Sequence, residues 1–177
     1  SNTNSAIKIS SNGAQFWDYS GVTRRATIDD DGIKFNADTS ADNGLDEYEE
    51  GTFTPSVSSG LSAGQIAYNS RSGRYTSIGN VCYFTFHMNI SSCSLDSGQL
   101  KFGGLPKTSV NNDSNKTGAA FMIISNGNIG STSTYRVETN STDLSIITAA
   151  GDAYAANSSS LDAGNRQIAF AGFYYTP

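Results

Sequence analysis

The segment Val81–Ile90, Val-Cys-Tyr-Phe-Thr-Phe-His-Met-Asn-Ile, decides the fold of the chain. In an extended strand, side chains at alternate positions point to the same side. One side of this segment carries Val81, Tyr83, Thr85, His87 and Asn89, and the other side is wholly apolar, with Cys82, Phe84, Phe86, Met88 and Ile90. The alternation predicts a strand with one face in a hydrophobic core and the other at least partly polar.

Short segments of the same kind surround it, separated by Gly, Asn and Ser roughly every 8–12 residues. Tight links such as Gly79-Asn80 predict hairpins, and no stretch combines a helical apolar stripe with helix caps. Residues 52–177 are therefore predicted to be all-β, an antiparallel sandwich that resembles a jelly roll. The expected strands are Phe53–Ser58, Gln65–Asn69, Arg74–Ile78, Val81–Ile90, Gln99–Phe102, Gly118–Ser125, Thr134–Glu138, Leu144–Ala149 and Gln167–Thr176.

The expected strand Gly118–Ser125 departs from the alternation, because Phe121, Met122, Ile123 and Ile124 are apolar in succession. A strand that is apolar on both faces needs cover on both. In a sheet with one solvated face, another subunit would supply the second cover. The equal alternative is a central strand beneath a long loop of the same chain.

Residues 1–51 differ from the rest in charge. They carry ten acidic and four basic residues, whereas residues 52–177 carry six acidic and seven basic residues. The join is the run Asp46 to Gly51, which is predicted to be a polar, acidic hinge. We therefore expect two parts, residues 1–51 and residues 52–177.

The first part has too little apolar material for a core of its own. Its apolar residues come in pairs two positions apart, such as Ile7 and Ile9, which is strand spacing. The dipeptides Asn12-Gly13 and Asp31-Gly32 predict hairpin turns between the pairs. Because small hairpins are marginal in isolation, we expect identical chains to supply the missing partner surface.

Composition excludes several classes of function. The 177 residues carry a net charge of −5 with a pI near 4.6, which argues against a nucleic-acid-binding surface. No apolar stretch approaches the roughly 18 residues of a membrane-spanning helix. Two Cys make neither a disulfide framework nor a four-Cys zinc site, and we expect reduced thiols at Cys82 and Cys93. The first residue is not Met and no signal peptide follows it, so we expect a piece of a longer protein.

Metal and nucleophile chemistry have weak signals in this sequence. Three chains meeting on an axis could each donate His87, but a half-exposed strand histidine beside Tyr83 is the better interpretation. The run Asp29-Asp30-Asp31-Gly32 lacks the ligand spacing and the closing Glu of an EF-hand calcium loop. There is no Gly-x-Ser-x-Gly elbow and no phosphate-binding glycine loop. We therefore expect no metal, no cofactor and no catalytic nucleophile.

Glycoside hydrolysis needs only two carboxylates, so the acidic residues of 52–177 are candidate catalytic residues for it. Five are Asp in turns rich in Gly, Ser and Asn, where Asp commonly binds its own backbone. Glu138 is the sole Glu there, and it follows Arg136 by two residues on the same strand face. A surface ion pair is the expected role of Glu138, and a catalytic pair with a turn Asp is the alternative.

Three long segments rich in Asn, Ser, Gly and Tyr are suited to binding, namely residues 111–117, 126–135 and 151–166. Their amides and hydroxyls both donate and accept hydrogen bonds, and Tyr offers a flat face for the apolar side of a sugar ring. The simpler interpretation of most such residues is a solvated turn. The candidate ligand-binding residues are Tyr154, Asp152, Asn157, Arg166, Tyr135 and Asn128.

Two motifs carry a resemblance to a known family. The junction Leu45-Asp46-Glu47-Tyr48-Glu49-Glu50-Gly51-Thr52-Phe53-Thr54-Pro55 resembles the stretch that opens the distal domain of many tail fibre and receptor-binding proteins of tailed bacteriophages. The segment Ser72–Val81 is similar to the Gly-x-Tyr-Thr-Lys-Ile-Gly-Asn-x-Val of that family, with Ser77 in place of the frequent Lys. Weaker likenesses lie in Arg24–Phe35, in Gly104-Leu105-Pro106 and in the closing strand Ile168–Thr176.

The resemblance implies a homotrimer. Residues 1–51 would form a shaft or collar segment of interwoven β structure, and residues 52–177 a β-sandwich tip domain in contact with the host surface. It implies a virion protein, assembled in the host cytoplasm and joined to an upstream shaft of the same fibre. The expected function is adhesion to a bacterial surface polysaccharide of the lipopolysaccharide type, without enzyme activity or membrane insertion. A tailspike-like glycanase and a purely structural trimerisation cap are the alternatives. The matched motifs are not catalytic, so they transfer no binding residue to this chain.

Overall fold

The structure, a computed structural model, describes residues 7–18, 20–36, 38–40, 45, 48–58, 66–93, 98–111, 117–125, 134–147, 155–156 and 166–177. All regular elements in these ranges are β-strands, and their pairings are antiparallel, so the prediction of an all-β chain is confirmed. None of these ranges contains a helix that could cross a membrane. The chain divides into two compact units, Ser1–Glu49 and Glu50–Pro177.

The first unit is a four-stranded antiparallel sheet in chain order. Its two predicted hairpins are present, with Gly13 and Gly32 both at positive φ, 99° and 100°. Positive φ at such turns is tolerated by glycine at no steric cost. After the last strand, Leu45 pairs with Ile33 through two backbone hydrogen bonds of 2.9 and 3.1 Å. The strands are β1 (Ile7–Ser10), β2 (Gly13–Trp17), β3 (Arg24–Asp29) and β4 (Gly32–Phe35).

The second unit contains one sheet of nine strands in the order β5-β7-β8-β15-β11-β12-β13-β10-β6. A two-stranded sheet of β9 (Gly98–Gln99) and β14 (Ala155–Ala156) accompanies it. The nine strands are β5 (Tyr48–Phe53), β6 (Ser56–Val57), β7 (Ile66–Ile78), β8 (Val81–Cys93), β10 (Lys101–Gly103), β11 (Gly118–Ser125), β12 (Thr134–Val137), β13 (Leu144–Ile147) and β15 (Arg166–Tyr175).

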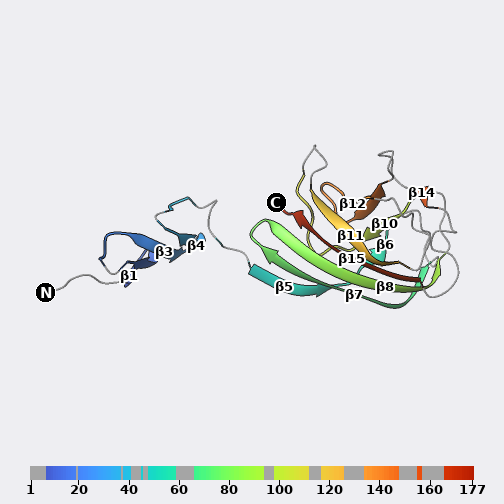
Figure 1. Ribbon diagram of the computed structural model, residues 1–177, viewed down its shortest axis with the longest axis horizontal. Coiled ribbons are helices and arrows are strands. Elements are labelled where there is room, and N and C mark those ends of the chain that lie inside the picture. The colour runs from blue at the N-terminus through green and yellow to red at the C-terminus, as the bar shows by residue number, and fades with distance from the viewer. Residues whose placement is uncertain are drawn as a thin grey trace. The chain divides into compact units, whose positions relative to one another are not determined.

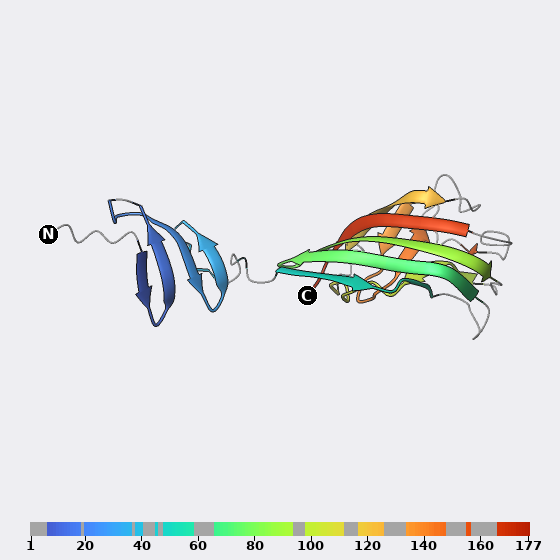
Figure 2. The same ribbon diagram turned by 90° about the horizontal axis from the view of Figure 1, so that it is seen from below.

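This sheet curls until its two edges lie close together. The edge strands β5 and β6 are separated in the chain only by Thr54 and Pro55, so Phe53 and Ser56 lie no more than about 11 Å apart. Side chains of β7 hold the junction: the Tyr68 hydroxyl accepts from the Val57 amide at 2.8 Å, and Arg71 donates to the Pro55 carbonyl at 3.2 Å. Figures 1 and 2 show the long, curved strands β7 and β8 that follow this curl. One continuous sheet thus takes the place of the two sheets of the expected sandwich.

The inside of the curl is the hydrophobic core. Phe170 of β15 lies at its centre, with ring centroids of Phe86, Phe102 and Tyr135 at 5.3, 5.1 and 4.9 Å. These partners come from β8, β10 and β12, so the two halves of the sheet face each other across their aromatic rings. The buried side chains of β8 match the predicted core face: Cys82, Phe84, Phe86, Met88 and Ile90.

Several strand boundaries differ from those predicted. Gln65–Asn69 and Arg74–Ile78 belong to the single strand β7, which runs through Ser70–Gly73 and adjusts its register at bulges around Tyr68. Phe53–Ser58 is interrupted, because its two halves lie on opposite edges of the sheet. The acidic run that was expected to be a hinge contributes Tyr48–Gly51 to β5.

Two glycines lock the edge strand β5 onto β7. A Cβ atom at Gly51 would lie 2.6 Å from the Tyr75 ring, and one at Gly73 would collide with the Phe53 ring. Each glycine therefore makes room for an aromatic ring of the neighbouring strand. Phe53 in turn packs edge-on against Phe86 of the core, at 6.1 Å between centroids. Both motifs of the family resemblance contribute to this interlock, which gives Gly-Thr-Phe and Gly-Arg-Tyr a structural role.

We predict that Gly73→Ala lowers the free energy of unfolding of the second unit by about 1–3 kcal/mol, because the added methyl group forces the Phe53 ring off the core. The matched control is Gly79→Asn, at a turn where nothing lies within 4 Å and φ is +52°, a value that Asn tolerates. Urea unfolding of the two variants measures the difference. Equal stabilities for the two variants would contradict the interlock.

Candidate functional site

Register places the apolar residues of the first unit on one face of its sheet. Directly paired residues of antiparallel strands share a face. The pairings connect the strands in two apolar rows and one polar row that lies between them on the opposite face. The apolar rows are Ile7-Phe16-Ala26-Phe35 and Ile9-Ala14-Ile28-Ile33, and the polar row is Lys8-Gln15-Thr27-Lys34.

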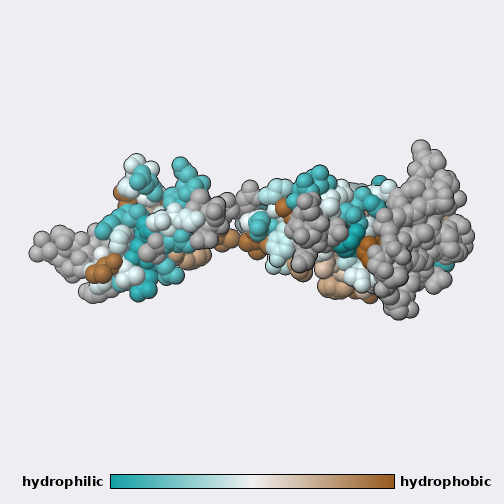
Figure 3. Space-filling model, turned by 90° about the horizontal axis from the view of Figure 1, so that it is seen from above, coloured by the Kyte–Doolittle hydropathy of each residue, from teal (hydrophilic) through white to brown (hydrophobic). Residues whose placement is uncertain are grey.

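The burial of these two faces is the reverse of that of an isolated globular domain. On the apolar face, Ile9 is 83% exposed and Phe35 is 60% exposed. On the polar face, Thr27 and Lys34 are only 4% and 3% exposed. The space-filling view shows brown, apolar surface on this unit (Figure 3). Apolar faces that remain this bare in a soluble protein mark a contact with another molecule.

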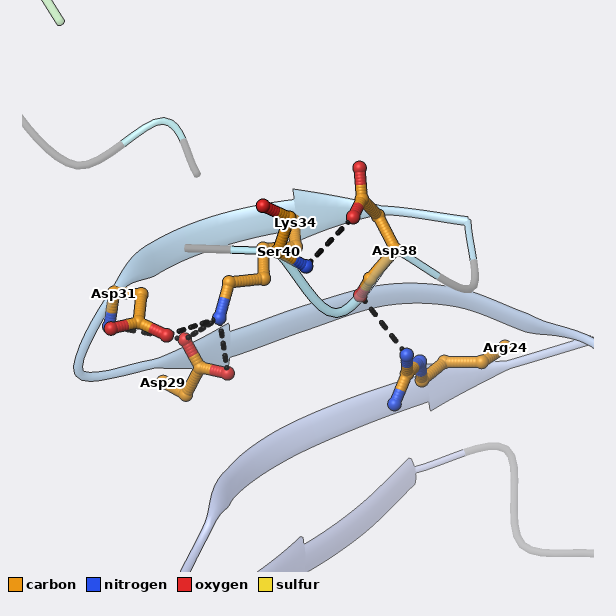
Figure 4. Close-up of polar contacts among 6 residues, drawn as sticks. All are labelled: Arg24, Asp29, Asp31, Lys34, Asp38 and Ser40. Atoms are coloured by element: carbon orange, nitrogen blue, oxygen red, sulfur yellow. Dashed lines mark hydrogen bonds and ion pairs between the residues drawn. The ribbon is translucent and has the colours of Figure 1, made fainter. Parts of the chain in front are cut away.

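An ion cluster lies on the polar face. The Lys34 Nζ atom donates to both carboxylate oxygens of Asp29 at 3.0 Å and to Asp31 at 2.6 Å (Figure 4). These hydrogen bonds raise the pKa of Lys34 and lower the pKa of Asp29 from their ordinary values. Beside them, Arg24 donates to the backbone carbonyl of Asp38 at 3.0 Å, which ties the segment after β4 to β3. The cluster stabilises the hairpin β3-β4 but does not cover the apolar face on the other side of the sheet.

Asp18 organises the connection between β2 and β3 in the same way. Its carboxylate accepts from the Ser20 hydroxyl at 2.7 Å and from the backbone amides of Val22 and Thr23 at 3.1 and 3.3 Å. The Ser20 hydrogen bond is the main reason that the pKa of Asp18 falls from 3.8 to about 2, with burial opposing it and the two amides adding to it. The ionised form of Asp18 thus belongs to the folded connection.

In the second unit, the outer face of the curled sheet carries a mixed polar and aromatic surface. Two rows of cross-strand neighbours follow from the register. They are Arg74-Thr85-Ala171-Phe121 and Thr76-Tyr83-Phe173-Ala119, each running across β7, β8, β15 and β11. On the same strands, Phe84, Phe170 and Tyr174 point into the core. The outer rows are the continuation of the polar face that was predicted for Val81–Ile90.

An open trough of about 670 Å³ lies over these rows, and β5 extends it; we call it the outer trough. Its polar lining side chains are Glu50, Thr52, Arg74, Thr76 and Thr85, and its exposed aromatic ones are Tyr83, Phe121 and Phe173. A volume in the range of about 300–1,000 Å³ is typical of ligand pockets.

The strand Gly118–Ser125 is central in the sheet, between β15 and β12. Met122 packs against the core, whereas Phe121 and Ile123 on the other side are 62% and 55% exposed. Of the parts of the chain that the structure describes, none covers these two side chains. A long loop of the same chain that covers this strand is therefore not seen in these parts. Cover by another subunit stays a prediction.

Four of the six predicted ligand-binding residues, Tyr154, Asp152, Asn157 and Asn128, lie outside the described residues. Arg166 is the first residue of β15, partly exposed and paired with Ile90.

Tyr135 lies in the core. It is 7% exposed, its ring packs edge-on against Phe170, and its hydroxyl lies 3.6 Å from the Met122 sulfur. Burial raises the pKa of Tyr135. A ring in this position does not offer a face to a ligand, so Tyr135 has to be removed from the candidate residues. Tyr135 and Arg166 do not meet either. Tyr135 packs against Phe170, and Phe170 lies four residues, about 13 Å, along β15 from Arg166.

Glu138 follows β12 and forms the ion pair that was expected with Arg136, at 3.2 Å. Burial by itself would raise the pKa of Glu138, but the hydrogen bond from Arg136 and the positive charges of Arg136 and Lys101 lower it. A general acid needs the opposite shift, since it must keep its proton near neutral pH. The environment of Glu138 is that of an ionised structural carboxylate.

The remaining candidates are strand residues. His87 is partly exposed on the outer face of β8, opposite Ser72 and Ala169. No cluster of His, Cys, Asp and Glu that could hold a metal occurs within the described ranges.

Cys82 and Cys93 are both buried thiols on β8. They lie eleven positions, about 36 Å, apart along the strand, which is too far for a bridge within one chain. Cys93, expected in a turn, is the last residue of the strand.

We predict that the first unit loses stability between about pH 4 and pH 2. The folded-state pKa values of Asp18 and Asp29 lie below their ordinary values, so each contributes stability above pH 3.8 that is lost as the pH falls through the folded pKa. Fluorescence of Trp17, the sole Trp in the chain, reports this unit.

Asp18→Asn should lower the stability at neutral pH and flatten the acid profile, while Asp30→Asn, in an exposed turn, serves as the matched control. An acid profile that Asp18→Asn leaves unchanged would refute the role of this carboxylate.

Comparison with protein-family models finds no match to this chain, and comparison with curated proteins finds none either. Among solved structures, the crystal structure of the Dettilon tailspike protein (gp208) is similar at 23% sequence identity and a TM-score of 0.49. The match covers 72% of this chain and 24% of that protein, so this chain spans about a quarter of the length of the tailspike protein. The activity of this chain must therefore be inferred from its own residues.

Proposed function

We propose that this chain is the distal part of a homotrimeric tail fibre or receptor-binding protein of a tailed bacteriophage, which attaches the virion to a glycan on the bacterial surface. The family resemblance of Leu45–Pro55 and Ser72–Val81 supports this proposal. The interlock of β5 and β7 gives both motifs a structural role, because they supply the glycines and the aromatic rings that fit together.

The observation that carries the proposal is the bare apolar face of the first unit. A sheet with one apolar face is stable only when another layer covers that face. Ile7, Ile9 and Phe35 are more than half exposed, whereas Thr27 and Lys34 on the polar face of the same sheet are buried. A second copy of the chain brings an equally apolar face, and copies arranged about an axis cover one another. This is how three short sheets become a shaft.

Adhesion follows from such an assembly through multivalency. A shallow sugar site binds weakly, but several sites on one fibre retain the virion because each bound site raises the effective concentration of the others. We propose the segments 126–135 and 151–166 as the contact region, with Tyr154, Asp152, Asn157, Asn128 and Arg166 as candidate contacts. The second unit is nearly neutral, so an anionic bacterial envelope does not repel it.

We further propose that the protein binds its polysaccharide without cleaving it, is located on the virion after assembly in the host cytoplasm, and continues an upstream shaft. The ionised state of Glu138 supports binding without cleavage, because the sole Glu of residues 52–177 is held by Arg136 and is not poised as a general acid. The acidic pI supports a partner other than nucleic acid.

We predict that the protein has about three times the 18.7 kDa mass of one chain in light scattering. Ile9→Asp, on the bare apolar face, should reduce the mass to that of one chain, since three buried carboxylates would meet at the interface. Ser10→Asp, at the next position on the opposite face, is the matched control and should keep the oligomer. A wild-type protein of 18.7 kDa with an ordered first unit would exclude the trimer.

We predict that incubation with host polysaccharide leaves the chain length of the polysaccharide unchanged while the protein binds it. Size-exclusion chromatography of the polysaccharide and pull-down of the protein measure the two properties. Glu138→Gln should behave like the wild type in both. Shortened chains that disappear with Glu138→Gln would establish the glycanase alternative.

The loop contacts have a separate test. The triple variant Tyr154→Ala, Asn128→Ala, Arg166→Ala should lose binding to host cells, and binding that survives it would place the contacts elsewhere. A wild-type trimer that fails to bind cells would favour a structural cap.

A further inference from the structure

The outer trough is a surface that the interlock of β5 and β7 does not explain, although residues of both sequence motifs line its polar side. It lies on the outside of a sheet whose inside is already filled by a complete aromatic core. The second unit therefore does not need the trough to be covered in order to fold. A hollow with converging polar and aromatic side chains on a self-sufficient domain is the usual form of a ligand site.

One side of the trough is polar. Arg74 and Thr76 of β7 and Glu50 and Thr52 of β5 line this side. They provide a guanidinium with several donors, a carboxylate that only accepts, and two hydroxyls that do both. The two charged groups have opposite signs, so this wall is close to neutral and favours neither an anion nor a cation.

The other side is aromatic. Phe121 of β11 and Phe173 of β15 line it, and Tyr83 of β8 joins them with a ring centroid 6.2 Å from that of Phe173. Tyr83 and Phe121 are 51% and 62% exposed, so their rings offer open faces instead of serving as packing material. Exposed rings of this kind stack on apolar C–H surfaces.

The floor between the two walls is made of small side chains. Thr85 and Ala171 are direct neighbours on β8 and β15, with Arg74 on one flank and Phe121 on the other. Four adjacent strands place the two flanks about 14 Å apart, since neighbouring strands are separated by roughly 4.8 Å. A flat ligand can lie on this floor and touch both walls at once.

We propose that the outer trough binds a neutral saccharide unit, an inference that rests on the proposed function and adds a second contact site, with its ligand class, to the loop segments proposed there. A pyranose ring has an apolar C–H face and a rim of hydroxyl groups. Its C–H face matches the rings of Tyr83, Phe121 and Phe173, and its hydroxyls match Arg74, Glu50 and the threonines. A second copy of the chain, the cover predicted above for Phe121 and Ile123, is the less suitable occupant of the trough itself, because it would have to desolvate the charged wall.

The test uses two trough variants of the full-length chain and one control. Thr85→Arg fills the floor, and Phe173→Ala removes part of the aromatic wall. Ser92→Arg places the same bulk on an exposed position of the same strand outside the trough and serves as the control. The probe is an array of bacterial surface polysaccharides, followed by titration of the neutral polysaccharide that gives the strongest signal. Light scattering records the mass of every variant.

We expect Thr85→Arg and Phe173→Ala each to weaken binding at least about tenfold, with the mass unchanged, and Ser92→Arg to bind like the wild type. Wild-type binding by both trough variants would overturn the trough site and leave the proposed adhesion standing. A folded wild-type oligomer that binds no polysaccharide on the array would overturn both proposals. A drop in mass with Thr85→Arg would overturn the saccharide site in favour of a second copy of the chain.

Discussion

The bare apolar face of the four-stranded sheet is the constraint on which the account of this chain depends. Exposure of two rows of Ile, Phe and Ala to water is unfavourable, and the described residues of this unit form no second layer that covers them. On its polar face it buries Lys34, which Asp29 and Asp31 hold through ion pairs. We propose that identical chains, each of which repeats the same pattern, supply the cover for this face.

The second unit differs from the first because it has a hydrophobic core of its own. Its nine-stranded sheet curls onto its own core, with Phe170 among the rings of three other strands and with the edges joined through Thr54 and Pro55. Tyr174 strengthens the closing strand, since its buried hydroxyl donates to the Lys107 carbonyl at 2.9 Å and accepts from the Lys107 amide at 3.0 Å. Because this unit folds around its own core, its folding does not require the outer face to be covered.

The sequence predicts much of the local structure and little of the site. Alternation in Val81–Ile90 and the hairpin dipeptides act between near neighbours, so the strand, its core face and the turns could be predicted. The single curled sheet could not, because strands far apart in the chain decide it. The same holds for the outer trough, which five strands assemble. Tyr135 ends a segment rich in Asn, Ser and Gly, but it also belongs to the alternating strand Thr134–Val137. The strand places its side chain in the core.

The most direct test is a photo-crosslink from the apolar face of the first unit. A benzophenone amino acid in place of Phe35, which is 60% exposed on this face, should join chains covalently into dimers and trimers on a denaturing gel. The same group in place of Val22, which is 77% exposed in the connection between β2 and β3, should give little product and sets the background. Single chains alone from the Phe35 position would contradict the account.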